Sequence, residues 1–408
     1  MATRKDKRGY ALYRGESQRK DGRYSFSYTD MNRKRHTIYA NDLTKLRLRE
    51  KKIKKDLEEH RDPFIGEKLS VSDLCRKYLE TKREIRESTL VNYYYTLEHI
   101  IEPNIGGWKI ARIRPSDLES FYFDLLDDGV KGSTVDNVHT IIHPAFSFAI
   151  SEGFLSQNPA VGLMKKVKKS DKYVREKRFA LTKPQQEKFV TFLNTHPEYA
   201  SWKNLFIAFL GTGCRMAELT GLTWNDINFD TNIIDINHQM TYHKHMDGKC
   251  YFECTSLLKT NDSKRTIPLF PSVREALLDE YCVNKTIGFS KYENGGYSNF
   301  VFTTYDGMPY TPSAINEAIE RVRVACNKEE TELAKKENRE PVLIPHFSCH
   351  SFRHTFCTRL CEVETNLKVI MSIMGHSDIS TTMNIYAECT AEKKQEAAIE
   401  LSETLYIC

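Results

Sequence analysis

The stretch "SCHSFRHTFCTRL", residues 348–360, places two histidines, two arginines and two cysteines within thirteen positions. Its apolar residues recur at every fourth position from Phe352 to Leu360, which is the spacing of one face of a helix. His350 and Arg353 lie one turn apart on another face of the same helix. The spacing therefore predicts a helix that packs into a core and points a pair of cationic side chains away from it.

The same stretch also contains the residue types of a zinc site. A closed tetrahedral site needs ligands that converge, whereas these would project from several faces of one helix. The candidates are Cys349, His350, His354, Cys357 and Cys361. We therefore expect no metal here. The eleven cysteines of the chain are scattered and follow no spacing pattern, so we interpret them as reduced thiols.

Length and composition indicate a soluble, intracellular protein of more than one domain. The 408 residues, 40% of them hydrophobic, suffice for two or three domains with real cores. No run of about 18 apolar residues occurs, so we expect no membrane association, and the N-terminal "MATRKDKRGY" lacks the apolar segment of a signal peptide.

The charge is unevenly distributed along the chain. Residues 1–60 hold 18 Lys and Arg against 9 Asp and Glu, while the whole chain has a net charge of only +5. A second basic stretch, residues 165–178, carries eight basic and two acidic residues. The first segment predicts a polyanion-binding module, and the second predicts a linker that crosses phosphates, with a merely solvated linker as the alternative.

Residues 1–66 are expected to form a small folded domain. "RYSFSYT" places its three aromatic side chains on one face of a strand, and Asp21-Gly22 before it suits a tight hairpin turn. With "YALYR" before this strand and "KRHTIYA" after it, we predict a three-stranded sheet followed by a charged helix over about residues 42–60.

The rest of the chain changes pattern twice. Residues 67–164 have helical periodicity and predict an all-α bundle of four or five helices. Residues 179–390 mix helices and strands: "NIIDINHQMTYHK" and "KCYFECTSLLKT" predict a hairpin with its tip at His245–Lys249, and "KRTIPL" predicts a third strand. We therefore expect a third, mainly α domain with a small antiparallel sheet.

Three further motifs carry polar residues in a fixed order. "GTGCRMAEL" places Arg215 at a helix start with Glu218 three positions on, which by itself could be an ordinary helix ion pair. "LLKTNDSKRTIPL" places Lys259 at the end of a hairpin strand. "IMGHSDISTTMNIY" places His376 after a helix-ending glycine and Tyr386 ten residues later.

Together with the His-x-x-Arg of the opening stretch, these motifs resemble the tyrosine recombinase (phage integrase) superfamily, whose catalytic domain carries Arg, Lys, His-x-x-Arg, His and Tyr in this order. The basic front region and the inserted hairpin are similar to those of integrases from bacterial conjugative transposons. The resemblance implies a site-specific recombinase that integrates and excises a mobile element. It would cut DNA through a 3′-phosphotyrosyl intermediate, with no ATP, metal or other cofactor.

The resemblance also implies the catalytic residues. They are Arg215, Lys259, His350, Arg353, His376 and Tyr386, with Glu218 in support. The two arginines would clamp the phosphate with His376 as a further donor, because a planar guanidinium offers two N–H groups to two phosphate oxygens. Tyr386 would be the nucleophile and His350 the base. The only other tyrosine after His376 is Tyr406, which is too far along the chain.

Two roles stay open. Lys259 is the candidate general acid that protonates the leaving 5′-oxygen, but Lys264 or Arg265 could serve instead. Glu218 would orient Arg215 or His350.

The hairpin residues His243, His245, Cys250 and Cys254 are of types that bind metals, but their spacing is irregular. For them we favour a solvated hairpin that touches DNA or a neighbouring subunit.

The expected partners follow from the same resemblance. Residues 1–66 would bind arm sites on double-stranded DNA, residues 67–164 would bind core sites, and residues 179–390 would form the catalytic domain. The protein would assemble as a tetramer on two DNA sites. An excisionase or a host DNA-bending protein could assist. In the tail, residues 391–408, an apolar stripe at Ala398, Leu401 and Leu405 predicts a helix that docks onto the next protomer or packs in cis.

Two other functions compete with recombination. A type IB topoisomerase-like enzyme would use the same chemistry to relax DNA, but the separate basic front domain and the tail argue against it. A DNA-binding regulator that has lost catalysis is the other, and the presence of every catalytic residue type argues against that.

Overall fold

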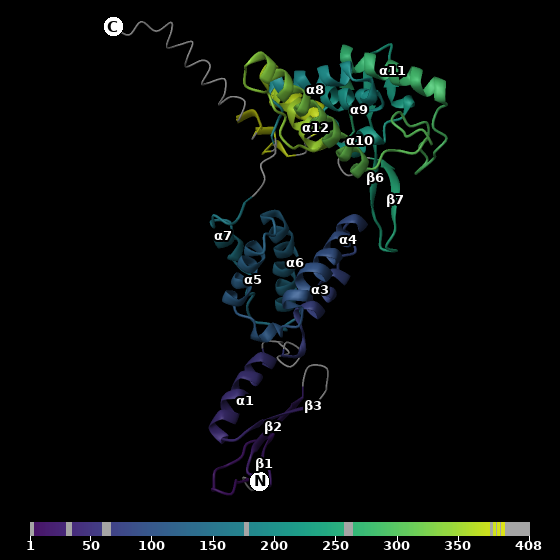
Figure 1. The fold of residues 1–408 in the computed structure, drawn as a ribbon. Helices are drawn as coiled ribbons and strands as arrows, with labels where there is room; N and C mark the ends of the chain where they lie inside the picture. Colours follow the sequence, from purple (N-terminus) through teal and green to yellow (C-terminus); the bar gives the residue numbers. More distant parts are fainter. Residues whose placement is uncertain are drawn as a thin grey trace. The chain divides into compact units, whose positions relative to one another are not determined.

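The computed structural model describes residues 4–29, 35–58, 67–174, 179–256, 264–375, 378–380, 382–383 and 385–387. The chain divides into two compact units, Met1–Glu176 and Lys177–Cys408, and each is described by itself (Figure 1). Among the described residues, no helix has both the length and the apolar character needed to cross a membrane.

The first unit begins with a three-stranded antiparallel sheet and a helix. The elements are β1 (Glu16–Gln18), β2 (Tyr24–Thr29), β3 (Arg35–Ala40) and α1 (Leu43–Glu58), with β2 in the centre of the sheet. The aromatic side chains of Tyr24 and Phe26 point to the same side and are buried together with Leu46 of α1. The predicted sheet, its hairpin turn and the helix are therefore confirmed.

The expected position of the first strand is wrong. "YALYR" contributes only an isolated bridge between Lys5 and Ala11, and β2 pairs instead with β1. The reason is the tight turn at Gly22, which has a φ of 85°. A short turn can pair β2 only with the residues directly before the turn, so Gln18 lies opposite Tyr24.

The rest of the first unit is the predicted helical bundle. Its helices are α3 (Val71–Glu80), α4 (Glu87–Thr96), the π-helix η1 (Leu97–Gly106), the 3₁₀ turn η2 (Ile110–Arg112), α5 (Pro115–Asp127), α6 (Gly132–Ser151) and α7 (Leu163–Val167). Ser70 caps α3 by accepting a hydrogen bond from the N–H of Asp73. The core contains the fully buried side chains of Tyr122 and Phe146.

The described part of the basic linker stretch is paired with this bundle. Its lysines form ion pairs Lys166–Glu119, Lys168–Asp136 and Lys172–Asp127. All three lysine side chains are more than 45% exposed, and exposed ion pairs of this kind contribute little to stability. The lysine side chains are therefore accessible from solvent.

The second unit is mainly helical around one large core. Its helical elements are α8 (Lys183–Thr195), η3 (Pro197–Tyr199), α9 (Ala200–Thr212), α10 (Met216–Thr220), η4 (Trp224–Asp226), α11 (Pro271–Ile287), α12 (Pro312–Glu337), α13 (Cys349–Val363) and α14 (Leu367–Met374). Phe352 of α13 is fully buried and packs against Phe206 and Phe209 of α9. This packing fixes the helix that carries the opening stretch.

Five strands of the second unit form two separate antiparallel pieces. β4 (Ile227–Asn228), β5 (Ile233–Ile236) and β8 (Arg265–Pro268) form one sheet, and β6 (His238–Lys244) and β7 (Cys250–Ser256) form a two-stranded ribbon. The tip of the ribbon is closed at His245 and Lys249, as expected. The third strand pairs with β5, so Arg265 lies opposite Ile236.

Candidate active site

The end of α9 places Arg215 in the site. Gly213 closes this helix in the left-handed conformation, with a φ of 61°. A Cβ at this position would lie 2.3 Å from an aromatic carbon of Phe356, so the close approach of α13 requires glycine here. The turn leads directly to Arg215, which is the N-cap residue of α10.

Glu218 holds Arg215 from the first turn of α10. Its carboxylate accepts a hydrogen bond from Nη1 of Arg215 at 2.6 Å and another from the Arg215 backbone N–H at 2.9 Å. The Glu218 side chain is fully buried, whereas that of Arg215 is 40% exposed. The guanidinium of Arg215 is therefore oriented from its buried side and remains accessible from the other.

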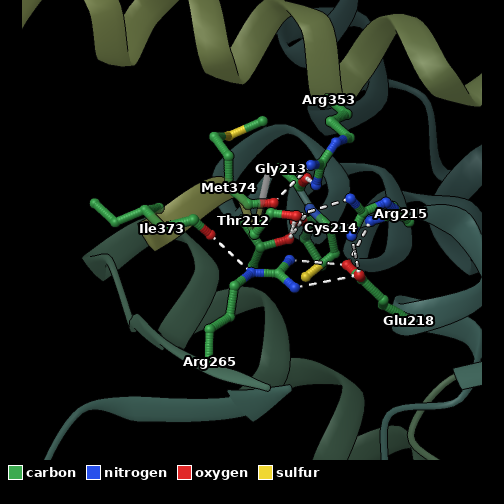
Figure 2. A network of polar contacts seen from close by, with 11 residues as sticks. Thr212, Gly213, Cys214, Arg215, Glu218, Arg265, Arg353, Ile373 and Met374 are labelled. Carbon is green, nitrogen blue, oxygen red and sulfur yellow. Dashed lines mark hydrogen bonds and ion pairs between the residues drawn. The ribbon is translucent and has the colours of Figure 1, made fainter. Parts of the chain in front are cut away.

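Arg265 of β8 is the second partner of Glu218. It donates from Nη2 to one carboxylate oxygen at 2.8 Å and from Nη1 to the other at 3.2 Å (Figure 2). Its side chain is only 3% exposed. Arg265 is thus an internal cation, and its two contacts to Glu218 are charge-assisted hydrogen bonds in the fork geometry that suits a carboxylate.

Arg353 of α13 lies beside these two arginines. Its Nη1 donates to the carbonyl of Gly213 at 2.7 Å and its Nη2 donates to the carbonyl of Met374 at 2.6 Å (Figure 2). The sequence predicted that Arg353 points away from the core, and this is wrong, because the residue is buried at 6% exposure. We call Arg215, Arg265, Arg353 and Glu218 the arginine cluster.

The pKa shifts in the arginine cluster follow from burial and charge. Burial alone would raise the pKa of Glu218, but hydrogen bonds and charge from Arg265, together with the charge of Arg215, outweigh it and lower the pKa to about 2. Burial, followed by the positive charge of Arg215, lowers the pKa of Arg353 to about 10. The cluster contains three guanidinium groups and one carboxylate, so it carries excess positive charge.

Of the other predicted catalytic residues, the structure describes His350 and Tyr386. His350 is exposed in the first turn of α13. Tyr386 is half-buried and packs against a small apolar cluster that α13 and α14 build around Cys357 and Met374. Lys259 and His376 lie outside the described residues, as do Tyr406 and the tail.

The sequence did not identify the role of Arg265. Of the alternatives to Lys259, Lys264 is exposed and Arg265 is buried in contact with Glu218. The signal lay in the alternation of "KRTIPL", because Arg265 and Ile267 both point inward from β8. An arginine on the inward face of a strand needs a buried partner, and the arrangement identifies that partner as Glu218.

The hairpin histidines lie on one face of the β6–β7 ribbon. The ligand atoms of His243, His245 and Glu253 are within 4.8 Å of one another, whereas Cys254 belongs to a separate apolar cluster with Met240. The ring of His245 is stacked on Tyr251 with 3.5 Å between centroids. The four suggested ligands of the hairpin are therefore not brought together.

Comparison with known proteins gives the family of the chain. Residues 180–393, more than half of the chain, match the phage integrase family. The chain belongs to this family. Residues 1–59 match the DNA binding domain of Tn916 integrase, and residues 70–126 match the phage integrase N-terminal SAM-like domain.

Individual relatives confirm the predicted subgroup. The transposase from transposon Tn916 of Enterococcus faecalis is 27% identical over 95% of this chain and 94% of its own length. The Tn1549 transposon integrase in complex with a circular intermediate DNA has a TM-score of 0.69 at 26% identity, covering 81% of this chain and 99% of that one. The lambda integrase tetramer bound to a Holliday junction has a TM-score of 0.53 at 17% identity, covers 90% of this chain and 96% of that one, and shares the fold.

The predicted fold class, enzyme class and function are confirmed by these matches. The chain is a tyrosine recombinase of the conjugative transposon type, and its activity is site-specific recombination of a mobile element.

Proposed function

We propose that the arginine cluster binds the phosphodiester at which DNA is cut and that Tyr386 is the nucleophile. The observation that carries this proposal is the convergence of three guanidinium groups from three separate elements on one place, at the end of α14. Tyr386 packs against side chains of α13 and α14, the helices that flank this place. Excess positive charge next to a phenol suits attack on an anionic ester.

Arg215 and Arg353 stabilise the charge that develops on the non-bridging oxygens in the transition state. Both are fixed before DNA arrives, Arg215 by Glu218 and Arg353 by the carbonyls of Gly213 and Met374. Donors that are already oriented cost no reorganisation at the moment of reaction. Arg215 presents the more exposed guanidinium and is the first to meet the phosphate.

The covalent step conserves the energy of the DNA bond. The Oη of Tyr386 forms a bond to phosphorus while the bond from phosphorus to the 5′-oxygen breaks. His350 takes the phenol proton, and Lys259 gives a proton to the leaving 5′-oxygen. His376 donates a further hydrogen bond to the phosphate. The 5′-hydroxyl of a second strand then attacks the 3′-phosphotyrosyl bond and releases Tyr386, so rejoining needs no ATP.

The remaining regions bind DNA at two kinds of site. We assign residues 1–66 to arm sites, 67–164 to core sites, 165–178 to a linker on the phosphates and 179–390 to catalysis. The matches of residues 1–59 and 70–126 to DNA-binding and N-terminal integrase domains support the first two assignments. Because phosphate contacts dominate such binding, its affinity should fall steeply with salt.

Assembly on two DNA sites completes the proposal. The structural relatives include complexes with DNA and a tetramer on a Holliday junction, which supports DNA binding and self-association by this chain. We assign the tail, residues 391–408, to docking onto a neighbouring protomer. An excisionase or a host DNA-bending protein would act on the complete assembly.

The test of Tyr386 is a covalent-trapping experiment. The protein is incubated with a nicked core-site duplex taken from the ends of the element that encodes it, and the products are separated on a denaturing gel. We expect a protein–DNA adduct with the wild type and with Tyr305→Phe, whose side chain is exposed, and none with Tyr386→Phe. An adduct with Tyr386→Phe, or none with a wild type that binds the duplex, would refute the proposal.

A further inference from the structure

Three consecutive backbone carbonyls at the end of α14 each accept a hydrogen bond from a different arginine. Figure 2 shows the bonds from Arg265 Nε to Ile373 O at 2.8 Å and from Arg353 Nη2 to Met374 O at 2.6 Å. The third bond runs from Arg215 Nη2 to Gly375 O at 2.9 Å. Carbonyls at a helix C-terminus have no intrahelical partner and carry the negative end of the helix dipole. The arginine cluster therefore holds the end of α14 by charge-assisted bonds.

Unlike Arg353, which is equally buried but donates to two backbone carbonyls, Arg265 is paired with a carboxylate. Its guanidinium binds both oxygens of Glu218 on one side and the carbonyl of Ile373 on the other. Burial alone would lower the pKa of Arg265, but the hydrogen bonds and charge of Glu218 outweigh it and raise the pKa. The charge of Arg265 is thus matched by Glu218 and its guanidinium is held on both sides by protein groups, which leaves the phosphate to Arg215 and Arg353.

We infer that Arg265 is a positioning residue for strand cleavage, and this inference depends on the proposed roles of Arg215 and Tyr386. Through Glu218 it sets the direction of the Arg215 guanidinium. Through Ile373 it fixes the end of α14, from which the chain continues to the segment that carries Tyr386. One buried cation thereby aligns the phosphate clamp with the element that leads to the nucleophile.

The glycine after α14 supports this view. Gly375 adopts a left-handed φ of 62° and ends the helix directly against Arg265. A Cβ at this position would lie 2.9 Å from Nη1 and 3.0 Å from Cδ of Arg265. The backbone is therefore fitted to this particular side chain, and a methyl group at position 375 would displace it or the helix end.

The conservative variant Arg265→Lys separates positioning from simple charge. A lysine keeps the positive charge near Glu218, but its single ammonium cannot bind two carboxylate oxygens and the Ile373 carbonyl in the same fork. We expect DNA affinity to stay within about twofold of the wild type. Single-turnover cleavage should fall at least about tenfold, less than the 10²–10³ typical of removing a direct donor.

Modified substrates distinguish positioning from acid catalysis. A 5′-bridging phosphorothiolate leaves as a thiolate and needs no proton, since the pKa of a thiol is only about 8.5. It should restore cleavage by Lys259→Ala but not by Arg265→Lys. A methylphosphonate at the scissile position removes one negative charge, so it should reduce the deficits of both Arg215→Lys and Arg265→Lys.

Arg323 offers a matched control. It also binds a glutamate with two nitrogens, Glu320, and donates to a backbone carbonyl, that of Ile344. Arg323→Lys should cleave like the wild type on all three substrates. If Arg265→Lys melts below the assay temperature, Gly375→Ala is measured on the same substrates, with the same pattern expected.

Three outcomes would overturn the inference. They are cleavage by Arg265→Lys at the wild-type rate, its rescue by the phosphorothiolate, and a deficit that the methylphosphonate leaves unchanged. The last would mean that the residue serves folding alone. Failure of the proposed function is seen separately, as a wild-type protein that binds the duplex but forms no adduct dependent on Tyr386.

Discussion

Two buried carboxylates of the second unit, Glu218 and Glu330, have partners of the same kinds. Each has a fully buried side chain and binds two cations and one backbone N–H. For Glu330 these are Lys188 of α8, Arg339 at 2.6 Å and the N–H of Val342 at 2.8 Å. From these local contacts alone, both clusters would be expected to have the same role, which is to stabilise the packing of separate elements.

The difference lies in the balance of charge. Arg339 also pairs with Glu337 at 2.6 Å, so the Glu330 cluster has two cations and two carboxylates. The arginine cluster has three guanidinium groups and one carboxylate, which pairs with two of them, and burial has lowered the pKa of the third, Arg353, to about 10. A buried surplus of positive charge costs stability, so it indicates a site prepared for an anion. The presence of ion pairs does not distinguish a structural cluster from an active site, whereas the net charge of the cluster does.

Neutralising each glutamate gives the largest expected effect. Removing one partner of a buried ion pair typically costs about 3–5 kcal/mol, so Glu218→Gln and Glu330→Gln should lower the free energy of unfolding by similar amounts. Urea unfolding measures this. Among the molecules that remain folded, only Glu218→Gln should also cleave DNA more slowly than the wild type. If Glu330→Gln slowed cleavage equally, the two clusters would not differ in function.

Replacing an arginine in each cluster sharpens the contrast in activity. Arg353→Lys should reduce single-turnover cleavage by about 10²–10³, because an ammonium cannot replace the oriented guanidinium. Arg339→Lys should leave the cleavage rate of folded protein unchanged. Both rates are read from adduct formation on the nicked duplex. A normal rate for Arg353→Lys would show that the surplus charge is not used on the phosphate.

The pH dependence of stability gives the smallest effect. The folded-state pKa of Glu218 is about 2, below its ordinary value of 4.5. Its stabilising contribution is therefore complete above pH 4.5 and is lost as the pH falls toward 2. The difference in urea midpoint between the wild type and Glu218→Gln should shrink over this window. A difference that stays constant from pH 5 to pH 2.5 would contradict the strong pairing of Glu218 with Arg265.

Most of the site's residue types could be predicted from the chain because they occur in short, locally ordered motifs. The hairpin tip at His245–Lys249 and the core position of Phe352 also followed from spacing alone. The first strand was misplaced because two segments before Gly22 could both pair with β2, and only the length of the turn decides between them.

The sequence by itself determined the order of the helices and strands, the uneven distribution of charge and the identity of the polar residues in the second unit. Only the tertiary structure decided that Arg353 is buried, that Arg265 shares Glu218 with Arg215, and that the end of α14 closes the cluster. The reason is physical. Periodicity indicates which face of an element avoids water, but the partner of a buried charge is set by contacts between segments that are 21 to 160 residues apart.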